Sequence, residues 1–392
     1  MSCNLKNQTE TSLKQAEKKL DLPEGVPPLT TLYLYISGSC NLACRHCWII
    51  PTHRTDGHEG QYVKTEHVQK VIRGAKPLGL GLVKLTGGEP MLHPQFREIV
   101  GLVNSEGVYM QIETNGTLLD HKMAKFLKQT RQLSFISISI DGATAESHDE
   151  LRGVTGSFDS AVGGIRNLVE EGFRPQLICT LHKGNMSQMD KIIGMAEDLG
   201  CGSIKFNHVQ KMGRGERYAE ELGLGVSELI NLYRSVENYF IPRSKISIHF
   251  DIPFAFYPIR KLLNDRLPRC NVRNILGMLA GGELSLCGIG VTIPELIYGQ
   301  IGEKSVKEVW CYSPGLTRLR DQVPSKLEGI CAQCFHRDIC LASCVANNFH
   351  MTGRLNAPFQ FCESADALRL FPESRKKNKI TGSRKGSCRG SL

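Results

Sequence analysis

Apolar, β-rich runs alternate with helical patterns through the first half of the chain. Six such runs lie between residues 31 and 208: TLYLYIS, LVKLT, VYMQIET, FISISI, QLICTL and SIKFNH. The segments between them place apolar residues three or four positions apart, which is typical of helices with one buried face. Strands and helices in alternation predict a parallel sheet, either open or curled into a barrel. In such folds the chemistry lies at the carboxyl ends of the strands.

Three of the helical segments have a clear apolar face and a clear end. In residues 93–107 this face is formed by Phe96, Ile99, Val100 and Val103, and Gly107 is a suitable stop. Residues 157–172 and 187–200 repeat the design, each from a serine to a glycine. These segments are predicted to be the crossover helices that join neighbouring parallel strands.

The pattern changes after residue 208. Residues 226–240 predict a helix and residues 245–250 a short strand, but periodicity is weak from Cys270 to Cys362. Glycine, proline and cysteine are frequent in that last segment. Such a segment can be organised by bound metal rather than by a large apolar core.

Composition indicates a soluble globular protein. The 392 residues allow one large or two to three ordinary domains, and they are 41% hydrophobic and 22% charged. No apolar run reaches the length of a membrane span, and the first twenty residues lack the apolar core of a secretory signal. We therefore expect a cytoplasmic protein that makes no contact with membranes.

The net charge of +9 is concentrated at the C-terminus. From Arg369 to Leu392 there are eight basic residues and one acidic residue, so the rest of the chain is nearly neutral. This tail is poor in apolar residues and is predicted to be disordered and solvated. The charge therefore predicts no nucleic-acid partner.

Fifteen cysteines point to metal or cluster ligation, because disulfides are disfavoured in the cytoplasm. The stretch GSCNLACRHCW, after the first predicted strand, holds Cys40, Cys44 and Cys47. A structural zinc site usually takes four ligands in two pairs. Three thiolates on one short loop instead suggest a metal centre with one open position.

This C-x3-C-x2-C loop resembles the signature of radical S-adenosylmethionine (SAM) enzymes. The resemblance implies a partial (β/α)6 TIM-type barrel with a [4Fe–4S] cluster on the three cysteines of the loop. It also implies that the fourth iron binds the amino and carboxylate groups of SAM. An open position separates a catalytic metal site from a structural one.

Further motifs follow successive predicted strands, and the resemblance implies that they bind SAM. They lie in LTGGEP, IETNG, SISIDG and HDELRG, together with the aromatic residue after the third cysteine. The residues are Gly87, Gly88, Glu89, Pro90, Glu113, Asn115, Ser139, Asp141, Arg152 and Trp48. Taken singly, GGEP could be a tight turn, Ser139 and Asp141 could cap a helix, and Arg152 could form a surface ion pair.

Seven cysteines in the last third resemble the SPASM extension of radical SAM enzymes, which binds auxiliary iron–sulfur clusters. The resemblance implies one cluster on Cys331, Cys334, Cys340 and Cys362 and another on Cys270, Cys287 and Cys344. The second set lacks the further cysteine of fully ligated relatives, which leaves open its fourth ligand. Cys311 is a spare thiol, but a buried bystander role suits it better. Gly288 follows Cys287, at the position where sulfatase-maturating members carry an acid.

These features predict five regions. They are an N-terminal extension (1–30), a radical SAM partial barrel (31–210), a bridging segment (211–269), a SPASM domain (270–365) and a basic, disordered tail (366–392).

The predicted activity is that of a radical SAM oxidoreductase. Reductive cleavage of SAM gives a 5′-deoxyadenosyl radical, which takes hydrogen from an unactivated carbon. The leading substrate class is a ribosomal precursor peptide that is oxidatively crosslinked, with a flavodoxin- or ferredoxin-type reductant and a separate leader-binding protein as expected partners. The alternative is side-chain modification of a tetrapyrrole, as in haem or haem-d1 pathways.

Two interpretations of another class stay open. The C-terminal cysteines could form a zinc-ribbon binding module, or the protein could be a simple electron carrier. The latter would not need the SAM-binding motifs. The sequence identifies no catalytic base or hydrogen donor, because nothing in their spacing selects Tyr298, Asp251 or Glu295.

Overall fold

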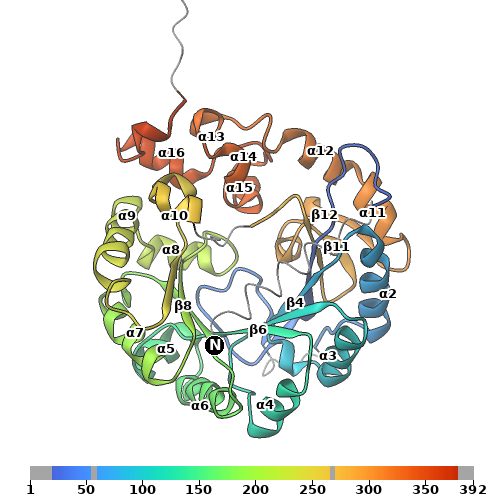
Figure 1. Ribbon diagram of the computed structural model, residues 1–392, viewed down its shortest axis with the longest axis horizontal. Helices are drawn as coiled ribbons and strands as arrows, with labels where there is room; N and C mark the ends of the chain where they lie inside the picture. Colours follow the sequence, from blue (N-terminus) through green and yellow to red (C-terminus); the bar gives the residue numbers. More distant parts are fainter. Residues whose placement is uncertain (1–19, 54–59, 265–269, 378–392) are drawn as a thin grey trace, which may run out of the picture.

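A ten-stranded sheet forms the centre of the molecule in the computed structural model, which describes residues 20–53, 60–264 and 270–377 (Figure 1). Six strands, all parallel, follow one another in chain order. They are β1 (Thr31–Ser37), β4 (Leu82–Gly87), β5 (Tyr109–Thr114), β6 (Leu133–Ser139), β7 (Gln176–Leu181) and β8 (Ser203–His208). These correspond to the six apolar runs of the sequence, so the predicted α/β architecture with a parallel sheet is confirmed.

Both edges of this parallel core are extended. Strand β9 (Ser247–Phe250) pairs in parallel with β8. On the other side β10 (Ile275–Met278) runs parallel to β1, and β11 (Glu283–Ser285) and β12 (Ile297–Gln300) continue the sheet antiparallel. The cysteine-rich segment therefore supplies strands to the same sheet as the N-terminal half.

Helices surround the strands in Figure 1. They are α2 (Thr65–Ala75), α3 (Phe96–Ser105), α4 (His121–Lys128), α5 (Ala145–Arg152), α6 (Ser157–Glu170), α7 (Met189–Asp198), α8 (Gly215–Leu222) and α9 (Val226–Ser235). The predicted helix over 226–240 is thus α9 followed by a π-helical turn, Val236–Phe240. The predicted crossover helices are α3, α6 and α7.

Shorter elements complete the chain, mostly in its last third. They are β2 (Ser39–Cys40), β3 (Thr52–His53), α10 (Ile259–Asn264), α11 (Val306–Tyr312), α12 (Pro314–Gln322), α13 (Gly329–Gln333), α14 (Arg337–Cys340), α15 (Val345–Thr352) and α16 (Gln360–Ala367). Figure 1 shows α13 to α16 grouped at one end of the molecule, outside the ring of helices.

The two faces of the parallel strands differ in polarity. The positions that pack against the helices are apolar and fully buried, as Leu85, Ile112 and Phe206 are. The alternate positions, such as Lys84 and Glu113, line an internal cavity. A strand alternates its side chains between faces, so this pattern builds an apolar outer layer around a polar interior.

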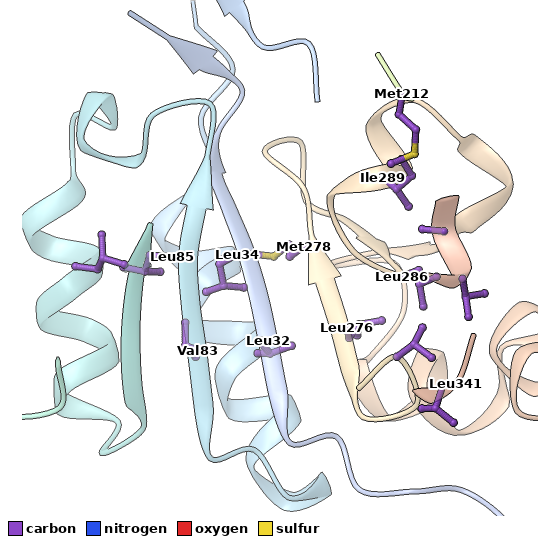
Figure 2. Packing of buried hydrophobic residues seen from close by; sticks show 14 of the residues in the cluster. Leu32, Leu34, Val83, Leu85, Met212, Leu276, Met278, Leu286, Ile289 and Leu341 are labelled. Carbon is purple, nitrogen blue, oxygen red and sulfur yellow. The ribbon is translucent and has the colours of Figure 1, made fainter. Parts of the chain in front are cut away.

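One apolar cluster joins the barrel to the cysteine-rich region. Figure 2 shows Leu32 and Leu34 of β1 between Leu85 of β4 and Met278 of β10, with Leu341 on the far side of β10. The two regions therefore share a core and do not form separate folding units.

The chain is packed beyond two of the predicted boundaries. Before residue 31, Leu29 is fully buried and the Pro27 carbonyl accepts a hydrogen bond from Trp310 Nε1 at 2.9 Å. After residue 365, α16 continues to Ala367 and Phe371 is buried. The predicted disordered tail is therefore wrong for residues 366–377, and its remainder, 378–392, lies outside the described residues.

No helix within the described residues combines the length and the apolar character needed to span a membrane.

Candidate functional site

The three-cysteine loop follows β1 and is fixed from both sides. Its backbone N–H groups at Ala43 and Arg45 donate to the carbonyls of Arg152 and Leu151, at the end of α5. Its Cys47 carbonyl accepts a hydrogen bond from the backbone N–H of Arg214 at 2.9 Å. The thiols therefore stand in a set position at the carboxyl end of the sheet.

One cavity of 820 Å³ brings two sets of cysteines together. Its wall includes the loop cysteines Cys40, Cys44 and Cys47 and, from the C-terminal region, Cys270, Cys287, Cys340 and Cys344. The two sets, more than 200 residues apart in sequence, thus face the same internal space.

The two glycines after β4 allow this strand to approach the cysteine loop. The backbone N–H of Gly88 donates to the Ser37 carbonyl at 2.7 Å, and a Cβ at Gly88 would lie 2.1 Å from the Ser39 carbonyl oxygen. Gly87 has φ +144°, where side chains are strained. Both glycines line the cavity, so they serve the close packing of the loop as well as the ligand face.

Glu89 lies beneath the cavity wall. Its carboxylate is fully buried and accepts hydrogen bonds from Met91 N, Thr114 Oγ1 and Asn115 N at 3.1, 2.7 and 2.8 Å. Burial raises the pKa of Glu89 to about 7. Neither Glu89 nor Pro90 is among the wall residues. In this conformation Glu89 joins the ends of β4 and β5.

Asn115, after β5, connects that strand end to the cysteine loop. Its Nδ2 donates to Asn41 Oδ1 at 2.8 Å and lies 4.0 Å from Cys40 Sγ. Its Oδ1 accepts from the backbone N–H of Thr117. Asn115 therefore faces the cavity beside the first thiol.

A buried ion pair lies beside the second thiol. Arg152 Nη2 is 2.6 Å from Asp141 Oδ2, and Nη1 donates to Cys44 Sγ at 3.7 Å. Asp141 is fully buried and is not part of the cavity wall, whereas Arg152 is. Burial opposes ionisation of Asp141, but Arg152, His46, His148 and the hydrogen bond from Thr180 N together outweigh it and lower the pKa of Asp141.

Glu113, the other acid predicted after β5, is paired with Lys84 of β4. Lys84 Nζ lies 2.9 Å from Glu113 Oε1 and 5.0 Å from the centre of the Tyr33 ring. Burial would raise the pKa of Glu113, but Lys84 lowers it overall. Ser139 and Trp48 also line the cavity, and Trp48 packs edge-on against Tyr35.

A second, smaller pocket is surrounded by four thiols of the C-terminal region. Cys331, Cys334, Cys340 and Cys362 line it together with apolar side chains such as Phe359 and Phe371. Cys340 lines both pockets. The four cysteines that the resemblance assigns to one cluster therefore line one pocket. Cys311 is buried in the core and lines neither pocket.

Burial affects the protonation of the thiols around both pockets. Burial raises the pKa of Cys40, Cys287 and Cys331 to about 12. Thiols of this kind are protonated at neutral pH unless a bound cation compensates the thiolate.

Sequence reasoning missed most of the polar interior. Lys205, Asn207 and His208 of β8, with Gln210 and Arg214 after it, line the cavity. The signal was present, because polar residues occupy alternate positions in SIKFNH. A half-polar strand in an otherwise buried parallel sheet indicates a cavity on its polar face.

A sheet with thiols grouped at its carboxyl ends defines an iron–sulfur enzyme of the partial-barrel type. Residues 34–196 match the model of the radical SAM superfamily, so this part of the chain carries a radical SAM domain. As a radical SAM enzyme it uses a [4Fe–4S] cluster and SAM.

Relatives match over most of the chain. An AdoMet-dependent heme synthase of Methanosarcina barkeri is 27% identical over 330 residues, which cover 81% of this chain and 91% of the relative. The mycofactocin maturase MftC of Mycobacterium tuberculosis is 26% identical over 353 residues, 89% of this chain and 85% of the relative.

Solved structures share the fold. Streptococcus suis SuiB bound to S-adenosylmethionine has a TM-score of 0.68 at 16% identity, covering 91% of this chain and 81% of that one. Native anSMEcpe with bound AdoMet has a TM-score of 0.66 at 18% identity, covering 86% of this chain and 95% of that one. Both are SPASM-type radical SAM enzymes.

Proposed function

We propose that this enzyme oxidises its substrate in the cavity between Cys40, Cys44 and Cys47 on one side and the C-terminal cysteines on the other. The observation that carries the proposal is the shared wall, to which both sets of thiols contribute. When bound, the cluster and SAM supply reductive cleavage of the sulfonium C–S bond and hydrogen-atom abstraction. A substrate in this cavity would lie between that centre and an acceptor for the remaining electron.

The surrounding residues would hold the reacting groups in place. Gly87 and Gly88 leave backbone open to SAM, and Arg152, Asn115 and Ser139 offer polar contacts on the cavity wall. Glu89 and Asp141 would act from behind the wall, by fixing the end of β5 and the guanidinium of Arg152. Trp48 would cover the adenine side.

The C-terminal thiols would ligate auxiliary clusters, one on Cys331, Cys334, Cys340 and Cys362 and one on Cys270, Cys287 and Cys344. Their arrangement around two pockets supports this assignment. In the described part of the chain, no three His, Cys, Asp or Glu side chains are spaced to hold a single metal ion.

The leading substrate class is a ribosomal precursor peptide that undergoes net oxidation, such as crosslinking. Similarity to a mycofactocin maturase along 89% of the chain supports this class. A tetrapyrrole is the second candidate. It is supported by similarity to an AdoMet-dependent heme synthase and by the cationic side chains of Lys205 and Arg214 on the cavity wall.

The test of the proposed chemistry compares Cys44→Ala with Cys311→Ala after anaerobic reconstitution. With SAM and dithionite, the wild type and Cys311→Ala are expected to form 5′-deoxyadenosine, and Cys44→Ala none. Cys44→Ala should also contain about four fewer iron atoms per chain than the wild type. Full product formation by Cys44→Ala would refute the assignment. Peptides encoded beside the gene and the tetrapyrrole Fe-coproporphyrin III are then incubated separately with the enzyme. Mass spectrometry shows which of the two substrate classes loses hydrogen.

A further inference from the structure

The cavity wall formed by β8 and the segment after it carries polar groups that the proposed chemistry does not use. Strand β8 is separated from β6 by β7, whereas the residues proposed to bind SAM follow β1, β4, β5 and β6. Its wall residues are Lys205, Asn207, His208, Gln210 and Arg214. This polar wall therefore faces the cavity from the side away from the glycine motif.

Arg214 has more buried polar atoms without a hydrogen bond than any other residue of the polar wall. Its Nε and Nη2 atoms are both buried, and neither makes a hydrogen bond within the described residues. A buried cation without an acceptor is costly, so such a group is usually paired. The planar guanidinium matches a carboxylate, which accepts two parallel hydrogen bonds.

Two neighbours on the polar wall have unmet groups as well. Asn207 Oδ1 and His208 Nδ1 are buried and make no hydrogen bond within the described part of the chain. His208 is held by its other ring nitrogen, which lies 3.3 Å from Gln210 Nε2. Three side chains that line the same cavity thus carry unmet polar groups, as expected where a polar ligand binds.

The polar wall is connected to the C-terminal cysteines. Gln210 Oε1 accepts a hydrogen bond from Asn347 Nδ2 at 2.7 Å, and the backbone N–H of Asn347 donates to Cys344 Sγ at 3.4 Å. A group bound at this wall would therefore lie beside the second set of thiols.

The backbone at Arg214 is fixed against the cysteine loop. Besides the hydrogen bond from its N–H to the Cys47 carbonyl, it is flanked by two tightly packed glycines. A Cβ at Gly213 would lie 2.7 Å from the Trp48 carbonyl oxygen, and one at Gly215 would lie 2.9 Å from that of His46. This close packing sets the guanidinium at a defined place relative to the three thiols.

We infer that Arg214 binds a carboxylate of the substrate, with Asn207 and His208 contacting the neighbouring part of the same molecule. This inference rests on the proposed function and deepens it, because it makes the substrate an acid. The carboxylate of SAM is the other source of this chemistry. The substrate is favoured because Arg152 already offers a guanidinium beside Cys44.

The first experiment titrates anaerobic holoenzyme with Fe-coproporphyrin III and, separately, with its tetramethyl ester, which lacks the negative charges. Wild type is compared with Arg214→Gln, Arg214→Lys and the control Arg217→Gln, whose side chain on α8 is 89% exposed. The acid is expected to bind wild type more tightly than the ester. Arg214→Gln should weaken acid binding about 10- to 100-fold and leave ester binding unchanged. Arg214→Lys should fall between, and Arg217→Gln should match wild type.

A parallel titration with SAM separates the two sources of the carboxylate. The inference predicts SAM affinity within about twofold of wild type in Arg214→Gln. A selective loss of SAM affinity would assign the guanidinium to the cofactor and overturn the substrate role. Equal binding of the acid by wild type and Arg214→Gln would also overturn it.

A simple dicarboxylate serves as a probe if the substrate is not a porphyrin. If wild type binds neither porphyrin, anaerobic crystals of the SAM complex are soaked in sodium glutarate. A carboxylate on Arg214 Nε and Nη2 supports the inference, and water alone at these atoms overturns it. Failure of the proposed function would appear separately, as the absence of 5′-deoxyadenosine from wild type.

Discussion

The barrel and the cysteine-rich region are built on different physical principles. In the barrel, α6 has 14 residues and β1 has seven, and most of their apolar positions are buried. In the C-terminal region α13 has five residues and α14 has four. Helices this short have little intrinsic stability, so they depend on what they pack against or bind.

Backbone conformation sharpens the contrast. Leu341, Ala342 and Ser343 have φ of 55°, 56° and 58°, in the left-handed region that costs about 1 kcal/mol or more for residues with a Cβ. This run joins Cys340, which lines both pockets, to Cys344, which lines only the main cavity. The chain accepts unfavourable conformations here in order to direct neighbouring thiols, whereas the barrel concentrates its left-handed residues at glycines.

The largest expected effect tests whether ligation holds the C-terminal region. Cys331→Ala should lose about four iron atoms per chain and make the amides of Gly329–Cys344 exchange rapidly, because α13 and α14 then lack their cross-link. The amides of β4 and β5 should stay protected. Hydrogen exchange with mass spectrometry measures both regions in one experiment.

The control for this variant is Cys201→Ala, which removes a fully buried thiol near β8. It should keep the full iron content and native exchange in the C-terminal region. Unchanged protection of Gly329–Cys344 in Cys331→Ala would mean that packing alone holds the region, and the comparison would fail.

The second prediction tests the apolar core of the barrel. Ile99 of α3 is fully buried, and Ile99→Ala should lower the free energy of unfolding by about 2–5 kcal/mol, since it removes apolar contacts and leaves a cavity. Urea unfolding monitored by circular dichroism measures the loss. The iron-free protein should show the same loss, because no ligand touches this core.

A matched substitution on the surface isolates the role of burial. Ile259→Ala removes the same atoms from a side chain that is 55% exposed, so it should change stability by less than about 0.5 kcal/mol. Equal effects of the two substitutions would show that core packing is not what holds the barrel.

The same difference decides what the sequence could predict. The runs TLYLYIS, QLICTL and SIKFNH coincide with β1, β7 and β8, because each alternating strand reports its own burial. The pairing of β10 with β1 could not be predicted, because it joins residues as distant in the chain as Thr31 and Ile275. The weak periodicity near Ile275 does not indicate which strand β10 would pair with. Long-range pairing is fixed by the shared core around Leu276 and Leu34.

The candidate site divides in a similar way. Motif order places Gly88 and Asn115 at strand ends, and the structure brings both to the cavity wall together with Arg152 at the end of α5. Order along the chain does not determine which way a loop side chain turns, so the buried positions of Glu89 and Asp141 were not predicted. Likewise, the basic composition after residue 365 led to a prediction of disorder, although Phe371 and Leu370 pack against the core and anchor this segment.

The smallest expected effect concerns a single hydrogen-bonded carboxylate in the barrel. Asp149 accepts hydrogen bonds from Gly156 N, Ser157 Oγ and Phe158 N at 2.6, 2.7 and 2.8 Å, and so fixes the start of α6. Burial opposes ionisation, but these hydrogen bonds outweigh it and lower the pKa of Asp149. A lowered pKa means that Asp149 stabilises the fold above its unfolded pKa of about 4 and that this stabilisation is lost as pH falls through the folded value.

Asp149→Asn should therefore lower the free energy of unfolding by about 1–2 kcal/mol, with a difference from wild type that is constant from about pH 8 to pH 5 and narrows towards pH 4 and below. Urea unfolding across this range measures the difference, with Asp159→Asn, an exposed acid in the first turn of α6, as the control. The control should cost only a few tenths of a kcal/mol. A difference in the free energy of unfolding that widened on acidification would mean that the folded state destabilises the carboxylate. The barrel would then contain a locally unfavourable group, as the cysteine-rich region does in its left-handed residues.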